Sequence, residues 1–130
     1  MADVNRGNRP LSPHLQVYKL PLAAITSIMT RITGHALVAG IVLLVWWLAA
    51  AVTSESAFAC ADWVLRSWIG FIIMTGAMWS LWYHLLAGIR HLGYDAGYGM
   101  GIECARKSSM ALIVGSVALA LLTLIIFFVF

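Results

Sequence analysis

Three long apolar runs constrain the fold of this chain more than any other feature of its sequence. They cover residues 21–53, 67–90 and 109–130 of the 130 residues. Each run reaches the roughly 20 residues that an α-helix needs to cross the hydrocarbon core of a bilayer. A transmembrane β-barrel would show short strands of alternating polarity, whereas these runs are continuous. The sequence therefore predicts an all-α integral membrane protein with three transmembrane helices, preceded by a polar segment over residues 1–20.

The composition agrees with a membrane protein. The chain is 62% hydrophobic and 10% charged, whereas a soluble domain is about 45–50% apolar and about 25% charged. The first 20 residues are polar and contain proline, so they do not resemble a secretory signal, whose apolar core lies near the start. We therefore expect the first apolar run to remain in the mature protein as a span.

Basic residues are distributed unevenly about the three expected spans. With three crossings, the N-terminal segment and the second connection share one side of the membrane. That side carries seven of the eight Lys and Arg residues, and the other side carries only Arg66. Because Lys and Arg concentrate on the cytoplasmic side, we predict a cytoplasmic N-terminus. The net charge of +3 then reflects orientation, and no nucleic-acid-binding motif accompanies it, so nucleic acid is not expected as a partner.

The two cysteines fall on opposite sides of the membrane in this topology. Cys60 lies in the outer connection, which we expect to be a loop, and Cys104 lies in the inner one. The thickness of the bilayer separates them, so they are not expected to form a disulfide with each other. The chain has no CxxCH motif, so covalent attachment of a c-type haem is not supported.

A stripe of small residues interrupted by histidines lies at the end of the second run. His84, Gly88 and His91 have the spacing of one helix face, and Ala77 and Ser80 extend that face upstream. Small residues allow close approach of either a neighbouring helix or a flat cofactor. A histidine inside a bilayer needs a partner, so the spacing leaves both haem ligation and interhelical hydrogen bonding open for His84. His91 lies nearer the interface, where a solvated side chain is the simpler interpretation.

A second polar face lies on the first run. Ser27, Arg31 and His35 are spaced four residues apart, and Thr30 and Gly34 lie beside them. An isolated arginine here could simply extend its charged group to the cytoplasmic surface. A serine, a threonine and a histidine on the same face instead favour a binding site. Both polar faces lie toward the predicted cytoplasmic side, so we expect one polar pocket there, accessible to cytoplasmic partners.

Two motifs resemble the signatures of a known family. The stretch RPLSPHLQVYKLPLAAITSIMTRITG, from Arg9 to Gly34, resembles the N-terminal signature of the cytochrome b membrane-anchor subunits of succinate dehydrogenase. The stretch HLLAGIRHLGYDAG, from His84 to Gly97, resembles their second signature. The order of the motifs, their spacing and the three spans all fit, and the resemblance covers nearly the whole chain.

The resemblance implies a function in respiration. The chain would be the membrane-anchoring, b-type-haem-binding subunit of succinate:quinone oxidoreductase, or complex II. It would help to pass electrons from the iron–sulfur subunit to ubiquinone in the tricarboxylic acid cycle and the respiratory chain. Its implied partners are a flavoprotein subunit, the iron–sulfur subunit and a second small membrane-anchor subunit, with which it would form a helical bundle. The implied location is the bacterial inner membrane in preference to the mitochondrial one, and this chain alone would hold no complete active site.

The resemblance also implies roles for four residues. His84 matches the axial ligand to the iron of a haem b shared with the second membrane subunit. Ser27 and Arg31 match quinone-site residues, and Arg31 also matches a neighbour of a haem propionate. His91 is assigned more weakly, as a neighbour of the haem. A b-type haem often has two imidazole ligands, so one chain with one well-placed histidine would supply half of the site.

The sequence departs from the family pattern at one position, and two other functions compete with the implied one. Thr30 stands where the family has a histidine near a haem propionate, and His35, about one turn further along, could replace it. A purely structural anchor would bind neither haem nor quinone. A small transporter could use intramembrane arginine and histidine, although three spans lack the usual inverted repeat.

Overall fold

The computed structural model describes residues 18–130 of the chain. Within them the regular structure consists of four helices: α1 (Leu22–Thr53), α2 (Glu55–Arg66), α3 (Trp68–Asp95) and α4 (Ile102–Val129). Helices α1, α3 and α4 are each long and apolar enough to cross a membrane. The prediction of an all-helical chain with three long apolar helices is therefore confirmed.

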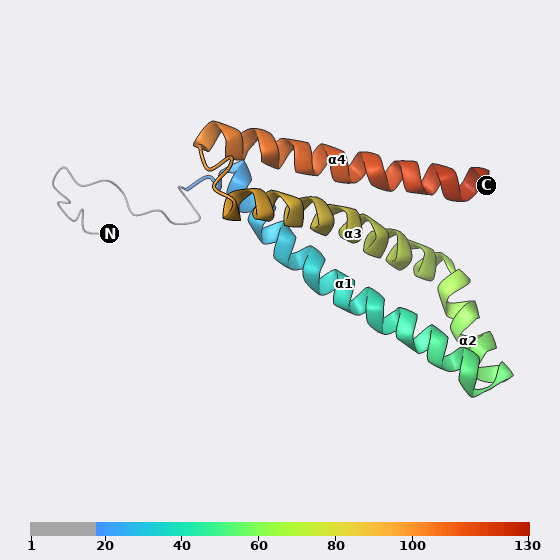
Figure 1. The fold of residues 1–130 in the computed structure, drawn as a ribbon. Helices are drawn as coiled ribbons and strands as arrows, with labels where there is room; N and C mark the ends of the chain where they lie inside the picture. Colours follow the sequence, from blue (N-terminus) through green and yellow to red (C-terminus); the bar gives the residue numbers. More distant parts are fainter. Residues whose placement is uncertain (1–17) are drawn as a thin grey trace, which may run out of the picture.

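Helix α3 lies between α1 and α4 (Figure 1). Helices α1 and α4 begin at the end of the molecule where α3 ends, and they diverge toward the opposite end, where α2 connects α1 to α3. We call the first of these ends the basic end. Of the Lys and Arg residues that the structure describes, all except Arg66 lie toward it: Lys19, Arg31, Arg90, Arg106 and Lys107.

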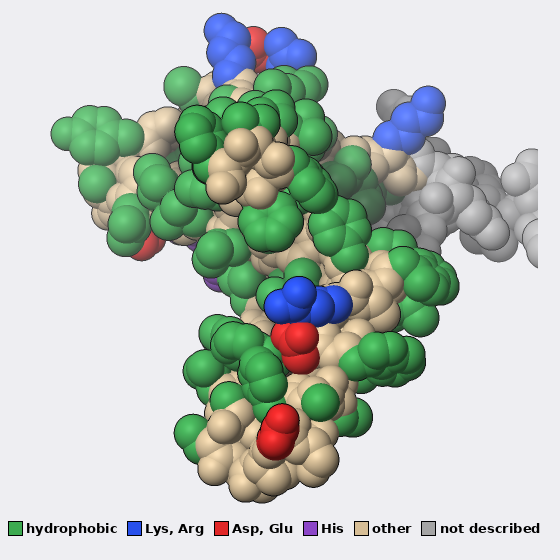
Figure 2. Space-filling view, turned by 90° about the vertical axis from the view of Figure 1, so that its right-hand side faces the viewer, with side chains coloured by type: hydrophobic (Ala, Val, Ile, Leu, Met, Phe, Trp, Pro, Cys, Tyr) green, Lys and Arg blue, Asp and Glu red, His purple; other side chains and the backbone are tan. Residues whose placement is uncertain are grey.

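Small and hydroxyl-bearing side chains fill the contacts between the helices, and large apolar side chains point outward. Tyr83, Ala87 and Leu112 form the core cluster between α3 and α4. The buried polar residues are Thr26, Thr33, Ser80, Ser109 and Ser116. This arrangement suits a bilayer, because lipid solvates large apolar side chains while small residues let the helices pack closely. Figure 2 shows the resulting hydrophobic surface at the end of the molecule that carries α2, with charged side chains confined to a few groups.

Helix α2 corrects our expectation of a loop around Cys60. The Ser54 side chain accepts a hydrogen bond from the backbone N–H of Ala57 at 3.2 Å and so caps the helix. Asp62 and Arg66 form an ion pair one turn apart, at 2.7 Å. A search for apolar runs of about 20 residues misses a helix of 12 residues with one polar face. The serine cap and the spaced ion pair were the sequence signals that could have revealed it.

Helices α2 and α3 meet at a tight corner. Ser67 caps α3 by accepting a hydrogen bond from the backbone N–H of Gly70 at 3.1 Å. A Cβ atom on Gly70 would lie 2.3 Å from the carbonyl oxygen of Val64. Only glycine permits so close an approach between the two helices, so this corner depends on that residue.

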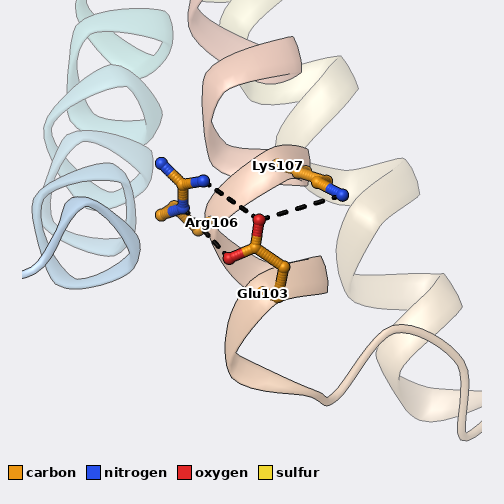
Figure 3. Close-up of polar contacts among 3 residues, drawn as sticks. All are labelled: Glu103, Arg106 and Lys107. Atoms are coloured by element: carbon orange, nitrogen blue, oxygen red, sulfur yellow. Dashed lines mark hydrogen bonds and ion pairs between the residues drawn. The ribbon is translucent and has the colours of Figure 1, made fainter.

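Helix α4 begins at Ile102, earlier than the apolar run that starts at Ser109. Its exposed first turns are held by Glu103, which pairs with Arg106 through two hydrogen bonds of 3.0 and 3.2 Å (Figure 3). Lys107 lies 3.8 Å from the same carboxylate. An acidic side chain in the first turn also stabilises a helix, because its negative charge lies near the positive end of the helix dipole. These polar contacts extend the helix beyond its apolar part.

Candidate functional site

The side chain of His84 lies where α3 crosses α1 near the basic end. Its Nδ1 atom is 3.1 Å from the carbonyl oxygen of Thr30 and 3.4 Å from the hydroxyl oxygen of Thr33. Because a carbonyl oxygen only accepts, Nδ1 carries the proton and donates it. In the neutral imidazole the lone pair then resides on Nε2. Within residues 18–130, this Nε2 atom makes no hydrogen bond.

The other described histidines are held differently. The Nδ1 atoms of His35 and His91 each lie 2.8 Å from the carbonyl oxygen four residues earlier in their own helix. Both side chains are exposed. Of the histidines in the part of the chain that the structure describes, His84 alone is hydrogen-bonded to a second helix. His14 lies outside that part.

A shallow cavity of about 280 Å³ lies beside His84. Its lining residues are Thr30, Arg31, Gly34, His35, Val38 and His84. A Cβ atom on Gly34 would lie 3.1 Å from the Cε1 atom of His84. The glycine therefore allows the imidazole to lie against α1, and we call this cavity the imidazole groove.

The imidazole groove fits one side of a b-type haem site. A metal-ligating histidine commonly donates its other N–H to a backbone carbonyl, which fixes the ring and leaves the second nitrogen for the metal. His84 has this arrangement with Thr30, and Arg31 and His35 on the groove can carry or share charge with a propionate. Among residues 18–130 no group of three His, Cys, Asp or Glu side chains could hold a metal ion. A haem takes only its axial ligands from the protein, and His84 is the described histidine whose imidazole is held against a second helix.

A second cavity of about 370 Å³ lies nearer the basic end. Its lining residues are Ala23, Ser27, Arg90, His91, Tyr94, Met100 and Ala105. The structure thus places Ser27 in this second cavity and Arg31 in the imidazole groove, although they are one turn apart on α1. We expected a single polar pocket, whereas the structure has two cavities that different residues of α3 line: Arg90, His91 and Tyr94 line the cavity with Ser27, and His84 lines the one with Arg31. His91 lies with Ser27 rather than beside His84.

Arg90 forms a polar cluster that sequence reasoning missed. Its Nη1 atom donates hydrogen bonds to the hydroxyl oxygens of Thr26 on α1 and Ser109 on α4, each at 3.0 Å. Tyr83 donates its phenolic hydrogen to the carbonyl oxygen of Thr26, also at 3.0 Å. We call these four residues the hydroxyl clamp. The sequence revealed Arg90 only as a contributor to the charge bias, because its partners come from two other helices.

Comparisons with known proteins cover almost the whole chain. A model of the succinate dehydrogenase/fumarate reductase transmembrane subunit family matches residues 5–124. The succinate dehydrogenase cytochrome b556 subunit of Paracoccus denitrificans is 83% identical over 130 residues, which is the full length of both chains. That of Rickettsia conorii is 36% identical over 114 residues, covering 88% of this chain and 89% of the relative. The mitochondrial cytochrome b560 subunit of Bos taurus is 36% identical over 111 residues, covering 82% of this chain and 64% of the relative.

Proposed function

Because this chain belongs to the succinate dehydrogenase/fumarate reductase transmembrane subunit family, we propose that His84 ligates a b-type haem and that Ser27 and Arg31 contact a quinone. The chain is a multi-pass membrane-anchor subunit of the succinate dehydrogenase complex. The predicted family and the predicted role as membrane-anchor subunit of the succinate dehydrogenase complex are therefore confirmed. The cofactor, the quinone site and the neighbouring subunits are argued below from the geometry of the basic end.

The hydrogen bond between His84 and Thr30 carries the haem proposal. It orients the imidazole and keeps the lone pair on Nε2, where a metal can bind. When bound, a b-type haem supplies a site that accepts and releases one electron. We propose that the second axial ligand comes from a second small membrane subunit, because His35 and His91 are exposed and bond only within their own helices. Arg31 and His35 on the same groove would face the propionates, with His35 replacing the family histidine at Thr30.

The second cavity suits a ligand that gains negative charge. A quinone carbonyl accepts hydrogen bonds, and the Ser27 hydroxyl can donate one. Arg31 lines the neighbouring imidazole groove, one turn away on α1. Its side chain is long and exposed, and we propose that it turns toward the ligand in the second cavity. As electrons arrive on the quinone, a fixed positive charge stabilises its oxygens more than it stabilises the neutral substrate. We propose that the electrons come from an iron–sulfur subunit that receives them from a flavoprotein subunit, and that ubiquinone accepts them.

Replacement of Ser27 or Arg31 tests the quinone site. We expect Ser27→Ala to lower succinate-dependent ubiquinone reduction by the assembled complex about fivefold, the size of one lost neutral hydrogen bond. Arg31→Leu removes a charged donor and should lower it by about tenfold or more. Electron transfer from succinate to a soluble artificial acceptor should persist, because such an acceptor can bypass the membrane pocket. The two rates are measured side by side on purified complex.

Helix α2, at the end of the molecule opposite the basic end, offers matched controls. Ser56→Ala and Arg66→Leu change exposed residues on α2, and both variants should keep full ubiquinone reduction. If ubiquinone reduction is unaffected in both Ser27→Ala and Arg31→Leu, the quinone binds elsewhere. If both activities fall together with the amount of assembled complex, the two residues are structural.

We further propose that the basic end faces the cytoplasm of a bacterial cell, with the chain in the inner membrane. The charge bias supports this orientation, and the Paracoccus denitrificans relative is bacterial. Cys60 and Cys104 are both exposed and lie toward opposite ends of the molecule. A membrane-impermeant maleimide added to intact spheroplasts should therefore modify Cys60 and spare Cys104, and lysed cells should show both modified. Modification of Cys104 in intact spheroplasts would reverse the proposed topology.

A further inference from the structure

We propose that Tyr83 and Arg90 are positioning residues for the haem ligand, acting by holding α1 in register with α3. This inference rests on the proposed ligation by His84. It concerns two side chains of the hydroxyl clamp that reach α1 from α3 without lining the imidazole groove.

Tyr83 and His84 each form a hydrogen bond from α3 to α1. These adjacent residues donate to the carbonyl oxygens of Thr26 and Thr30, which are one turn apart on α1, at 3.0 and 3.1 Å. A slip of α1 by one residue would move both acceptors about 1.5 Å along the axis and about 100° around it. Both hydrogen bonds would then break together. Tyr83 is 1% exposed, so water cannot replace its bond, and the register that suits Tyr83 also fixes His84.

Arg90 binds the same turn of α1 through the side-chain hydroxyl of Thr26, whereas Tyr83 binds that turn through the backbone. The hydroxyl groups of Thr26 and Ser109 donate their hydrogens to carbonyl oxygens of their own helices, at 3.1 and 2.7 Å. Their lone pairs are therefore free to accept the two hydrogens of Arg90 Nη1. Both hydroxyl residues are fully buried, at 0% exposure, and the guanidinium also lies 5.7 Å from the ring centroid of Tyr94. Thr26 is thus held through its carbonyl by Tyr83 and through its hydroxyl by Arg90.

The consequence for a bound haem concerns how strongly His84 would donate electron density to the iron. A strong hydrogen bond from Nδ1 to the Thr30 carbonyl makes the imidazole a better donor to the metal and favours the oxidised iron. If α1 loses its register contacts, this hydrogen bond lengthens and the ring can turn. The haem should then become easier to reduce, and the geometry of its axial ligand should become less uniform.

The variant Tyr83→Phe tests this inference, because it removes only the hydroxyl group that donates to the Thr26 carbonyl oxygen. In the purified complex, we expect the variant to retain haem, to shift the midpoint potential of the haem upward and to alter the low-spin ferric resonance in electron paramagnetic spectra. Tyr98→Phe is a matched control on an exposed loop residue, and both measurements should be unchanged in it. Arg90→Met should produce a shift in the same direction, and Arg90→Lys, which keeps a charged donor, should recover part of it.

The outcomes separate this inference from the proposed haem ligation. If the wild-type complex has no haem that depends on His84, the ligation fails and the positioning role fails with it. If the haem depends on His84 but Tyr83→Phe leaves both the potential and the ferric resonance unchanged, only the positioning role is overturned. A third outcome is that Tyr83→Phe reduces the amount of assembled complex while the complex that does assemble keeps the wild-type haem potential. That result would overturn the positioning role too, and would show that Tyr83 contributes to stability instead.

Discussion

Replacing His84 with leucine should abolish the low-spin b-type spectrum of the assembled complex. Leucine fills a similar volume but has no nitrogen to bind iron, and no other described histidine is held between α1 and α3. Since a non-covalent haem is retained largely through its axial ligands, we expect loss of the haem or conversion to a high-spin form. A reduced-minus-oxidised visible spectrum of the purified variant measures this directly.

His91→Leu is the matched control for this experiment. Its imidazole bonds only to its own helix and is exposed, so this variant should retain the low-spin spectrum. An unchanged spectrum in His84→Leu would contradict the ligand assignment. A wild-type complex that lacks a b-type band altogether would instead favour the purely structural anchor.

Replacing Ser109 with leucine should prevent the complex from accumulating. Ser109 is fully buried where α4 meets α1 and α3. Loss of its hydrogen bond to the Arg90 guanidinium costs about 2 kcal/mol, and overpacking at a closed site costs about 1–3 kcal/mol more. The sum is a large part of the roughly 5–15 kcal/mol that stabilises a typical domain. The amount of assembled complex in membranes and its thermal unfolding midpoint measure the effect.

Two variants calibrate the Ser109 result. Ser109→Ala loses only the hydroxyl group, so its unfolding midpoint should fall by less and the complex should still assemble. Ala111→Leu adds apolar volume at an exposed position on the same helix, and assembly should be normal. Normal amounts of complex in Ser109→Leu would show that α4 does not dock through this residue.

Hydropathy was sufficient to predict α1, α3 and α4, because a bilayer requires long apolar helices whose backbone groups bond internally. Helix α2 was missed because the same criterion ignores a short helix with charged residues on one face. Its signals were local ones, a serine cap before Glu55 and the spacing of Asp62 and Arg66. The start of α4 was placed too late for the same reason, since Glu103 and its two basic partners stabilise a turn that is not apolar.

The sequence could predict which site residues share a face of one helix, but not which residues of different helices come together. Helical spacing placed His84 with other polar residues, and spacing also placed Ser27 and Arg31 on one face. Spacing could not show that these two residues line different cavities, because that depends on which residues of α3 lie opposite each of them. The hydroxyl clamp could not be predicted either, because Thr26 and Ser109 are ordinary small residues until the packing of three helices brings them to Arg90.

A structure of the assembled complex with its haem, at a resolution that shows side chains, is the most direct test of the central claim. The account predicts that the haem iron is bound by Nε2 of His84, that Nδ1 of the same ring still donates to the Thr30 carbonyl, and that Arg31 faces a propionate. A haem whose iron is bound by a different residue of this chain, or one that lies away from the imidazole groove, would contradict the account.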